Sequence, residues 1–548
     1  MPSVSAHVAH SLAFSVRHVF GVMGAGNAHL IDAVERHPRA QFIPLRHEGG
    51  AVVAADAHFR AGGGLAAATT TCGPGFTNTL TALAEAALAR SPLLLVAGDE
   101  PSTGKRPWGV DQSAMARAAG VRTFTAGTRD AAYTTVRAIE HALAERTPVV
   151  LAIPADLAAA DAAALPEVQV LRRAAPMVPC STEIDRLASM IAAAERPLLV
   201  AGRGAWLADA GGALGELADL TGAVTASSVL GLGTFPSRSH DVGVLGGFGA
   251  TGALSLVHDA DLALVVGSSL DRHFLRSGGL FAPGTRVIQV DITAAATDVR
   301  VDDYIRGDAR LVAEALVAEL RTRGRSQGVW RDCVDPDIHL ARDEGDQRAA
   351  DGRLDPRSTA VALAELLPED RVVVTDGGHF LGWPIMHWPH TSPERLVTLG
   401  TAFQAVGLGI PAVVGAALAR PETTVVLVTG DGGGLMALAD LESAIRVAAG
   451  RGVAVVWNDA AYGAELNVYG ALGLAEGPML IPEVDFAGVA ASLGAEGVVV
   501  RTMADLGALA VWTGRDPVER PFLLLDLRIS PQIVAPYLLD LLHAAAAC

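Results

Sequence analysis

Short apolar runs that end at glycine-rich or polar turns recur along the whole chain, and longer segments with helical periodicity separate them. Runs such as 424–429 and 453–457 are rich in β-branched residues and show no alternation of apolar and polar positions. This pattern is typical of strands buried on both faces, as in parallel sheets. Comparable runs occur in three parts of the chain, at 19–23, 41–45, 65–71, 93–97 and 149–153, at 197–204, 261–267 and 286–291, and at 371–376, 424–429 and 453–457. The pattern predicts an α/β protein with doubly wound parallel sheets.

Two irregular segments divide these runs into groups. Residues 156–179 are rich in Ala and Pro, and residues 324–353 are polar and charged, so both are expected to be linkers. A length of 548 residues suits about three domains of ordinary size. We therefore expect three domains, at residues 1–165, 180–325 and 354–540.

Composition and charge exclude several classes of protein. The net charge is −17 and no run of Lys or Arg is present, which argues against a nucleic-acid partner. The four cysteines are scattered and form no CxxC pair, which argues against a disulfide framework or a zinc site and fits a reducing cytoplasm. No signal peptide is evident, and the uncharged stretch 396–419 is interrupted by Gln404, Pro411 and glycines. We expect a soluble cytoplasmic protein that does not enter a membrane.

The segment 430–434, Gly-Asp-Gly-Gly-Gly, follows the strand 424–429 directly and leads into an expected helix at 435–449. Glycines at such a turn let the backbone approach phosphate oxygens. The strand 453–457 ends at Asn458 and Asp459, so Asp431 and Asp459 are both expected at the carboxyl edge of one sheet, where α/β folds bind ligands. Two carboxylates beside a phosphate cradle suit Mg²⁺. Either fragment alone could be an ordinary turn, but the pair, 28 positions apart, is more specific.

This pattern resembles the diphosphate–metal motif of the thiamine diphosphate (ThDP) enzymes. The resemblance implies ThDP and Mg²⁺ as cofactors, with the metal held by Asp431, Asp459 and the backbone carbonyl of Ala461. The segment 400–411 resembles the loop that bends the cofactor, which puts Val406 under the two rings and the Gln404 carbonyl near the 4′-amine; core packing is the alternative role for Val406. The cofactor-binding residues implied in this way are Gly377, Gly378, His379, Gln404, Val406, Gly430, Asp431, Gly432, Gly433, Asp459, Ala461, Tyr462 and Gly463.

Glu48 begins an expected helix after the strand 41–45. One interpretation is a carboxylate that complements the helix N-terminus. The other comes from the segments 46–50 and 73–78, which resemble the pyrimidine-binding domain of ThDP enzymes, where a glutamate contacts N1′ of the aminopyrimidine. Sharing a proton with N1′ favours the imino tautomer that removes the thiazolium C2 proton, and a buried acid with a raised pKa does this best.

Nearly the whole chain resembles the acetolactate synthase and 2-oxo acid decarboxylase branch of this family, with its three domains in the same order. The resemblance implies a homodimer or homotetramer with active sites at the subunit interface, and a 2-oxo acid and a carbonyl acceptor as small-molecule substrates. FAD, which some members carry in the central domain, is doubtful because Phe248 stands where a histidine is usual and 268–273 departs from the usual arginine-containing run. By the same resemblance, the catalytic residues are Glu48, Gln112 and Glu465, and the substrate pocket contains Ala25, Gly26, Thr71, Phe76 and Val468.

The reaction is less well defined than the family. Glu465 matches a catalytic glutamate of pyruvate-type decarboxylases but is equally compatible with a solvated helix position. In both branches CO₂ leaves a 2-oxo acid such as pyruvate because the thiazolium accepts the electrons. Few acid or base side chains are expected near the thiazolium, and this favours transfer of the acyl carbanion to a second carbonyl over its protonation. The alternatives are a decarboxylase that releases an aldehyde with help from Glu465, alone or with His379 or His29, a non-catalytic ThDP-binding homologue, and a flavin-dependent oxidase.

Overall fold

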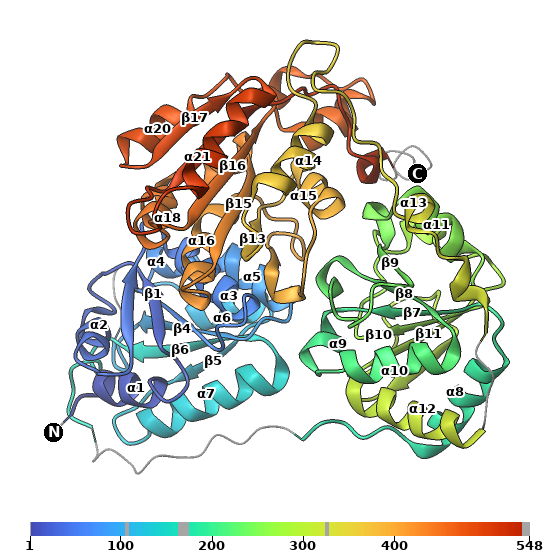
Figure 1. Ribbon diagram of the computed structural model, residues 1–548. Helices are drawn as coiled ribbons and strands as arrows, with labels where there is room; N and C mark the ends of the chain where they lie inside the picture. The colour runs from blue at the N-terminus through green and yellow to red at the C-terminus, as the bar shows by residue number, and fades with distance from the viewer. Residues whose placement is uncertain (1, 105–108, 163–174, 324–327, 540–548) are drawn as a thin grey trace.

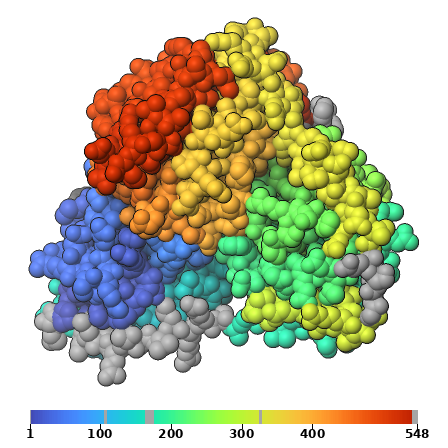
Figure 2. Space-filling view, in the orientation of Figure 1, coloured from blue at the N-terminus to red at the C-terminus, as the bar shows by residue number. Residues whose placement is uncertain are grey.

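The computed structural model describes residues 2–104, 109–162, 175–323 and 328–539, which form three lobes that meet at a common junction (Figure 1). Figure 2 shows the N-terminal, central and C-terminal lobes as three separate masses in contact with one another. Each lobe contains one sheet of six parallel strands with helices packed on it. The predicted fold class, α/β with three doubly wound parallel sheets, is confirmed. The exact domain boundaries remain predictions.

The N-terminal sheet has the strand order β2-β1-β3-β4-β6-β5. Its strands are β1 (His18–Gly21), β2 (Gln41–Pro44), β3 (Ala67–Thr70), β4 (Leu93–Asp99), β5 (Arg122–Thr125) and β6 (Pro148–Pro154). Its helices are α1 (Val4–Leu12), α2 (Ala28–Glu35), α3 (Glu48–Arg60), α4 (Pro74–Thr77), α5 (Leu80–Leu88), α6 (Gln112–Ala118) and α7 (Ala131–Glu145). The sequence did not predict β5, which lies at the sheet edge and has two exposed ends and two half-buried central residues.

The central sheet has the order β12-β11-β10-β7-β8-β9. Its strands are β7 (Pro197–Ala201), β8 (Val224–Ser227), β9 (Asp241–Val244), β10 (Leu262–Val266), β11 (Arg286–Asp291) and β12 (Asp303–Arg306). Its helices are α8 (Ser181–Ala193), α9 (Arg203–Leu207), α10 (Gly211–Thr221), α11 (Thr251–His258) and α12 (Ala309–Arg323), with a short 3₁₀ turn η2 (Gly246–Phe248). Residues 163–174, which are half of the predicted linker 156–179, lie outside the described residues, and α13 (Pro336–His339) lies within the predicted linker after this lobe.

The C-terminal sheet has the order β14-β13-β15-β16-β18-β17. Its strands are β13 (Arg371–Thr375), β14 (Leu396–Thr398), β15 (Thr424–Gly430), β16 (Gly452–Asn458), β17 (Glu496–Val500) and β18 (Leu523–Arg528). Its helices are α14 (Pro356–Leu366), α15 (Gly382–His387), α16 (Gly409–Ala419), α17 (Asp431–Met436), α18 (Leu441–Val447), α19 (Gly463–Glu465), α20 (Phe486–Ser492) and α21 (Gly507–Thr513), with 3₁₀ turns η5 (His379–Leu381) and η7 (Leu438–Asp440). Every residue of β15 and β16 is buried, as expected for strands covered on both faces.

Helices α3 and α16 join the N-terminal and C-terminal lobes (Figure 1). Both are apolar around most of their circumference, which suits helices that are buried on all sides. Their backbones approach so closely that a Cβ atom on Gly415 would lie 1.9 Å from the carbonyl oxygen of Ala54. The two helices therefore form one continuous core between the lobes.

The prediction of one continuous helix at 435–449 is wrong. Helix α17 ends at Met436, Ala437 has φ −110° and ψ 15°, and η7 separates α17 from α18. The cause is a tertiary contact: the Asp440 carboxylate accepts a hydrogen bond of 2.8 Å from the backbone N–H of Arg46. The apolar pattern continues through this break, so the pattern does not predict that the helix is interrupted.

The apolar stretch 396–419 consists of β14, an irregular loop and α16. Within the described part of the chain, no helix is long and apolar enough to cross a membrane.

Candidate active site

The glycine-rich turn at the end of β15 is shaped by close contacts that exclude side chains. A Cβ atom on Gly432 would lie 2.7 Å from Cε1 of Tyr462, and one on Gly433 would lie 2.6 Å from Oδ2 of Asp376. Residues 430–434 are all buried. The turn therefore presents backbone to the carboxyl edge of the sheet, which is the geometry that a diphosphate group requires.

Asp431 and Asp459 lie at adjacent strand ends, as predicted. Strands β15 and β16 are parallel neighbours, and their pairing matches Gly430 with Trp457. Both carboxylates are buried, and burial raises the pKa of each. The negative charge of Asp431 raises the pKa of Asp459 further. Two mutually repelling buried carboxylates are stable together when a cation lies between them.

The oxygen atoms at these strand ends fit a divalent metal ion. Oδ2 of Asp431 and Oδ1 of Asn458 are buried and accept no hydrogen bond from any residue that the structure describes. Oδ1 of Asp459 accepts a bond of 3.3 Å from the N–H of Ala461, so this backbone segment lies beside the carboxylate. No group of three His, Cys, Asp or Glu side chains is placed for metal binding among the described residues. The remaining ligands would then be backbone and cofactor oxygens, which is typical of Mg²⁺.

His379 lies against the same site. A Cβ atom on Gly463 would lie 2.4 Å from Oδ2 of Asp459 and 3.2 Å from Nδ1 of His379. Burial lowers the pKa of His379 to about 4, so its ring is neutral. Nε2 accepts a hydrogen bond of 2.8 Å from the N–H of Ala535, so the ring proton is on Nδ1, facing Gly463. His379 can thus donate a hydrogen bond toward the predicted diphosphate position.

A tyrosine near the end of the described chain supports this turn. The hydroxyl of Tyr537 lies 2.9 Å from the carbonyl oxygen of Gly378 and 3.1 Å from that of His379, and donates to one of them. Its ring packs on Phe248 of the central lobe, with centroids 4.7 Å apart. Gly378 has φ +146°, a conformation that favours glycine. The 377–379 turn is therefore held by two other segments of the chain.

Val406 lies above the glycine-rich turn. Its Cγ1 atom is 3.2 Å from the position of a Cβ on Gly433, and its Cγ2 atom is 3.8 Å from that of a Cβ on Gly377. The side chain is 40% exposed, which argues against simple core packing. Gln404 is exposed with φ +59°, and its side chain donates to the carbonyl of Thr401. The loop thus holds Val406 and the Gln404 backbone beside the candidate diphosphate site.

Glu48 begins α3, and its carboxylate accepts a hydrogen bond of 3.0 Å from Nδ2 of Asn78. Its Oε1 atom lies 3.3 Å from the position of a Cβ on Gly75. In the described residues, no hydrogen bond joins Glu48 to the 400–408 loop or the 430–434 turn of its own chain. The structure therefore places Glu48 on the N-terminal lobe with its carboxylate half-buried and turned to Asn78.

Three of the predicted substrate-pocket residues lie together near Glu48. Oγ1 of Thr71 accepts a bond of 2.9 Å from the N–H of Gly26, and Ala25 beside it is exposed. A Cβ on Gly75 would lie 2.7 Å from Cγ2 of Thr71. Phe76, by contrast, is completely buried in the N-terminal core and lines no surface.

The other predicted residues lie in different environments. The amide of Gln112 is fully engaged: Oε1 accepts from the N–H of Gly73, and Nε2 donates to the carbonyl of Gly98 and to Asp99. Gln112 thus joins two strand ends of the N-terminal sheet. Glu465 is exposed on α19, and Val468 is half-buried against the C-terminal core.

The central sheet has a point between β7 and β10 where the strand order reverses, which is where such folds bind nucleotides. The loops after these two strands are bonded to each other through the N–H of Gly204 and the carbonyl of Gly267, at 2.8 Å. A Cβ on Gly202 would lie 2.4 Å from the same carbonyl oxygen. The strand ends are in backbone contact at this point, and the turn Gly202-Arg203-Gly204 packs directly against Gly267.

Sequence reasoning missed several residues of the site. Asp376 follows a strand and could have been found by that position, as Asp431 and Asp459 were. Glu85 and Tyr537 are far along the chain from their partners and carry no local signal. Their contacts appear only in the folded molecule.

Three models of the thiamine pyrophosphate enzyme family match the chain. They are the N-terminal TPP binding domain over residues 3–119, the central domain over residues 184–316 and the C-terminal TPP binding domain over residues 376–512. Two acetolactate synthase large subunits are among the relatives. Isozyme 2 of Escherichia coli K12 is 30% identical over 453 residues, covering 80% of each chain. The large subunit of Haemophilus influenzae is 28% identical over 445 residues, covering 79% of this chain and 78% of the relative.

Solved structures with the same fold include two decarboxylases. The ThDP-dependent 4-hydroxybenzoylformate decarboxylase of Rhodococcus jostii RHA1 has a TM-score of 0.79 at 22% identity and covers 96% of this chain and 99% of that one. Benzoylformate decarboxylase from Polynucleobacter necessarius has a TM-score of 0.80 at 19% identity and covers 97% and 99%. These likenesses show the three-domain fold, whereas the sequence matches show the family. The chain therefore belongs to the thiamine pyrophosphate enzymes, in the group similar to the acetolactate synthases, and its cofactor is thiamine diphosphate.

Proposed function

We propose that this protein is a Mg²⁺-dependent carboligase that decarboxylates a 2-oxo acid and joins the acyl group to a second carbonyl. One observation supports the choice of carboligation: the polar side chains that meet at Glu48 and Gly75 are those of Thr70, Thr71 and Asn78, and hydroxyl and amide groups do not deliver a proton at neutral pH. Proton delivery competes with attack on a second carbonyl, so its absence favours ligation. The acetolactate synthase relatives agree with this choice.

The residues of the chain have separate tasks in this proposal. Backbone N–H groups of the 430–433 turn and Nδ1–H of His379 bind the diphosphate, and Asp431, Asp459 and the Ala461 carbonyl hold Mg²⁺. When bound, ThDP supplies the nucleophilic carbon and the electron sink that the decarboxylation needs.

The other residues act on the rings of the cofactor and on solvent. Glu48 would share a proton with N1′ of the pyrimidine and so would promote ionisation of the thiazolium. Val406 would support the two rings from below, and Ala25 would help to exclude water from the site.

We also propose that a second copy of the chain completes the site. Glu48 makes no hydrogen bond to the cofactor residues of its own C-terminal lobe within the described parts of the chain, although both are needed. The surface around those residues is apolar and open, with exposed fractions of 46% for Phe403, 40% for Val406 and 57% for Met436. A partner's N-terminal lobe, which carries its own Glu48, would cover this surface in a homodimer or homotetramer.

The central lobe is proposed to bind no FAD. Its strand-order reversal is closed by backbone contact between Gly204 and Gly267, and Phe248 packs against Tyr537 instead of facing an open cleft. Purified protein is therefore expected to show no flavin absorbance near 450 nm. A yellow protein would contradict this part of the proposal.

A decarboxylase that releases an aldehyde is the second candidate. The observation in its favour is the position of Glu465 on α19, a helix that contacts the η5 turn at His379–Leu381. Glu465 therefore lies near the 377–379 turn and could protonate a product. Replacing Glu465 by Gln should then suppress aldehyde release much more than CO₂ release.

Product analysis tests the two candidates. Purified protein is incubated with pyruvate, ThDP and Mg²⁺, with Glu48→Gln as the control, and the products are separated. Acetolactate from the wild type alone is the expected result. Acetaldehyde instead would favour the decarboxylase. No turnover of pyruvate, together with tight ThDP binding, would mean that the donor is a different 2-oxo acid, and a panel of 2-oxo acids would then be tried.

A further inference from the structure

The loop between β14 and α16 carries Gln404 and Val406 but has little support of its own. Residues 401–407 form no helix or strand, and Ala402, Phe403, Gln404 and Val406 are exposed. Gln404 is in the left-handed region, and Gly407 has φ +85°. Such a loop needs fixed anchors at both ends if it is to hold a side chain under a cofactor.

Both anchors are buried carboxylates. On the C-terminal side, Oδ1 of Asp376 accepts from the N–H groups of Gly407, at 3.0 Å, and Leu408, at 3.1 Å. On the N-terminal side, Oε2 of Glu85 accepts from the N–H groups of Ala402, at 3.1 Å, and Phe403, at 2.7 Å. Asp376 belongs to the same lobe as the loop, whereas Glu85 lies on α5 of the N-terminal lobe.

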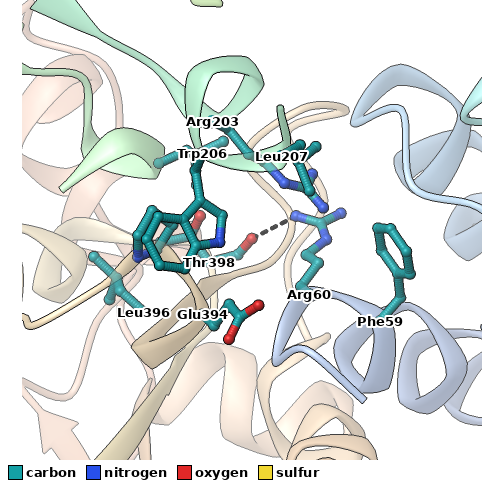
Figure 3. A pocket seen from close by; sticks show the side chains of 10 residues that line it. Phe59, Arg60, Arg203, Trp206, Leu207, Glu394, Leu396 and Thr398 are labelled. Carbon is teal, nitrogen blue, oxygen red and sulfur yellow. Dashed lines mark hydrogen bonds between the residues drawn. The ribbon is translucent and has the colours of Figure 1, made fainter. Parts of the chain in front are cut away.

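Arg60 in turn holds the Glu85 carboxylate in place. The Arg60 guanidinium forms a two-point ion pair with Asp56, at 2.6 and 2.7 Å, and its Nη2 lies 3.4 Å from Oε1 of Glu85. Its Nη1 donates to the carbonyl of Thr398, the last residue of β14, at 2.7 Å (Figure 3). Burial alone would lower the pKa of Arg60, but the carboxylates of Asp56 and Glu85 outweigh it, and the pKa is raised. The group stays charged and ties α3 to the strand from which the loop starts.

We infer that Glu85 is a positioning residue for the cofactor loop: it fixes the 401–406 segment so that Val406 and the Gln404 carbonyl meet the rings of ThDP. The inference rests on the proposed function of that loop. It assigns to the N-terminal lobe a second task, carried out on the cofactor loop of its own chain. Arg60 and Asp56 serve the same task by holding Glu85.

A carboxylate is the group that this position requires. Both oxygens of Glu85 face donors, since Oε2 faces two backbone N–H groups and Oε1 faces Arg60. A glutamine in the same place would set its NH₂ group against one of these donors. Because Glu85 is 1% exposed, no water would compensate for the lost bond.

The test compares binding of the whole cofactor with binding of its diphosphate half alone. In the proposed site the loop would contact the rings, whereas the backbone N–H groups of the 430–433 turn and the carboxylate pair with its metal would bind the diphosphate. Glu85→Gln should therefore weaken binding of ThDP with Mg²⁺ about tenfold or more, by loss of one charge-assisted hydrogen bond, while binding of inorganic diphosphate with Mg²⁺ is unchanged. Both affinities are measured by calorimetric titration of the full-length protein.

A matched control is Asp241→Asn in the central lobe. This change also neutralises a carboxylate that accepts a backbone N–H, here that of Gly243 at 2.9 Å, but far from the loop. Both affinities should stay at the wild-type level. If Glu85→Gln does not fold, Glu85→Asp is used, because it keeps the charge but moves the carboxylate away from the loop. Binding of ThDP should then weaken by a smaller factor, and binding of inorganic diphosphate should again be unchanged.

The outcomes are distinct. Weaker binding of ThDP alone supports the inference. Equal weakening of both ligands, or no change in either, overturns it. If the wild-type protein binds inorganic diphosphate but not ThDP, the proposed function fails and the role of Glu85 fails with it.

Discussion

Two buried histidines make the stability of the N-terminal lobe sensitive to acid. Nδ1 of His58 lies 3.2 Å from the carbonyl of Gly64 and must donate to it, so Nε2 of His58 accepts a bond of 3.1 Å from Nδ1–H of His18. This arrangement requires both rings to be neutral. Burial, then the nearby His58 and Arg17, lowers the pKa of His18 from 6.5 to about 4.

The sign of the pH effect follows from this depressed pKa. Between pH 6.5 and 4 the unfolded chain binds a proton at His18 and the folded chain does not, so the free energy of unfolding falls as the pH falls through this window. The loss is roughly 3 kcal/mol at most. Replacing His18 by Gln should flatten the dependence in chemical unfolding between pH 7 and 4.5. Exposed His29→Gln is the control, and an equal slope in wild type and His18→Gln would refute the prediction.

Some site residues could be predicted from the sequence because their signal is local. Asp431 and Asp459 each follow a strand that is recognisable from its β-branched residues, and parallel strands bring such positions to one edge. Glu85 gives no such signal. It reads as an ordinary helix residue, and its partner N–H groups at Ala402 and Phe403 are more than 300 positions away. Its role depends on packing between lobes.

At the scale of elements, the contact between α3 and α16 depends on Gly415. A Cβ there would meet the Ala54 carbonyl at 1.9 Å, so the two helices would have to separate. Gly415→Ala should therefore lower the free energy of unfolding by about 2 kcal/mol or more, although alanine is the better helix former. The measurement is urea unfolding at pH 7.

Gly212 in α10 is the matched control. A Cβ at this position meets nothing within 4 Å. Gly212→Ala should stabilise the protein by about 0.5–1 kcal/mol through helix propensity alone. If Gly415→Ala were also stabilising, the tight helix contact would be contradicted.

Two features of the fold that the sequence did not predict can be explained physically. Strand β5 is an edge strand with half-exposed positions, so its apolar signal is weak. The break between α17 and α18 is set by Asp440, whose carboxylate binds the backbone of Arg46 from another lobe. Local periodicity describes a helix well where packing is uniform, and fails where a distant segment competes for its polar groups.

At the scale of the whole molecule, the site is expected to combine Glu48 of one subunit with Asp431 of another. Glu48→Gln and Asp431→Asn should each abolish turnover of the accepted 2-oxo acid. Co-expression of the two variants should restore activity, because a mixed dimer has one site with neither change. Mixed dimers selected through two different tags would have about half of the wild-type sites. Activity is measured on protein purified through two different tags.

The control for this experiment is Glu48→Gln paired with itself under both tags, which should remain inactive. Mixed dimers without activity would mean that Glu48 and Asp431 serve the same site from one chain. That outcome would leave the ThDP fold intact but would remove the argument for a shared interface.

The close contact of α3 with α16 also bears on how such a protein can diverge. Helix α3 starts with Glu48, and α16 starts directly after the loop that carries Val406. Since Ala54 and Gly415 already touch, the backbone fixes the distance between Glu48 and Val406 of one chain, which the proposed dimer assigns to two neighbouring sites. Selection therefore cannot easily change how these two sites are spaced. New substrates would have to be accommodated by exchanging side chains at the rim, such as Ala25, Thr71 and Val468. Related proteins with different donors and acceptors should therefore differ at these rim positions and share the contact between α3 and α16.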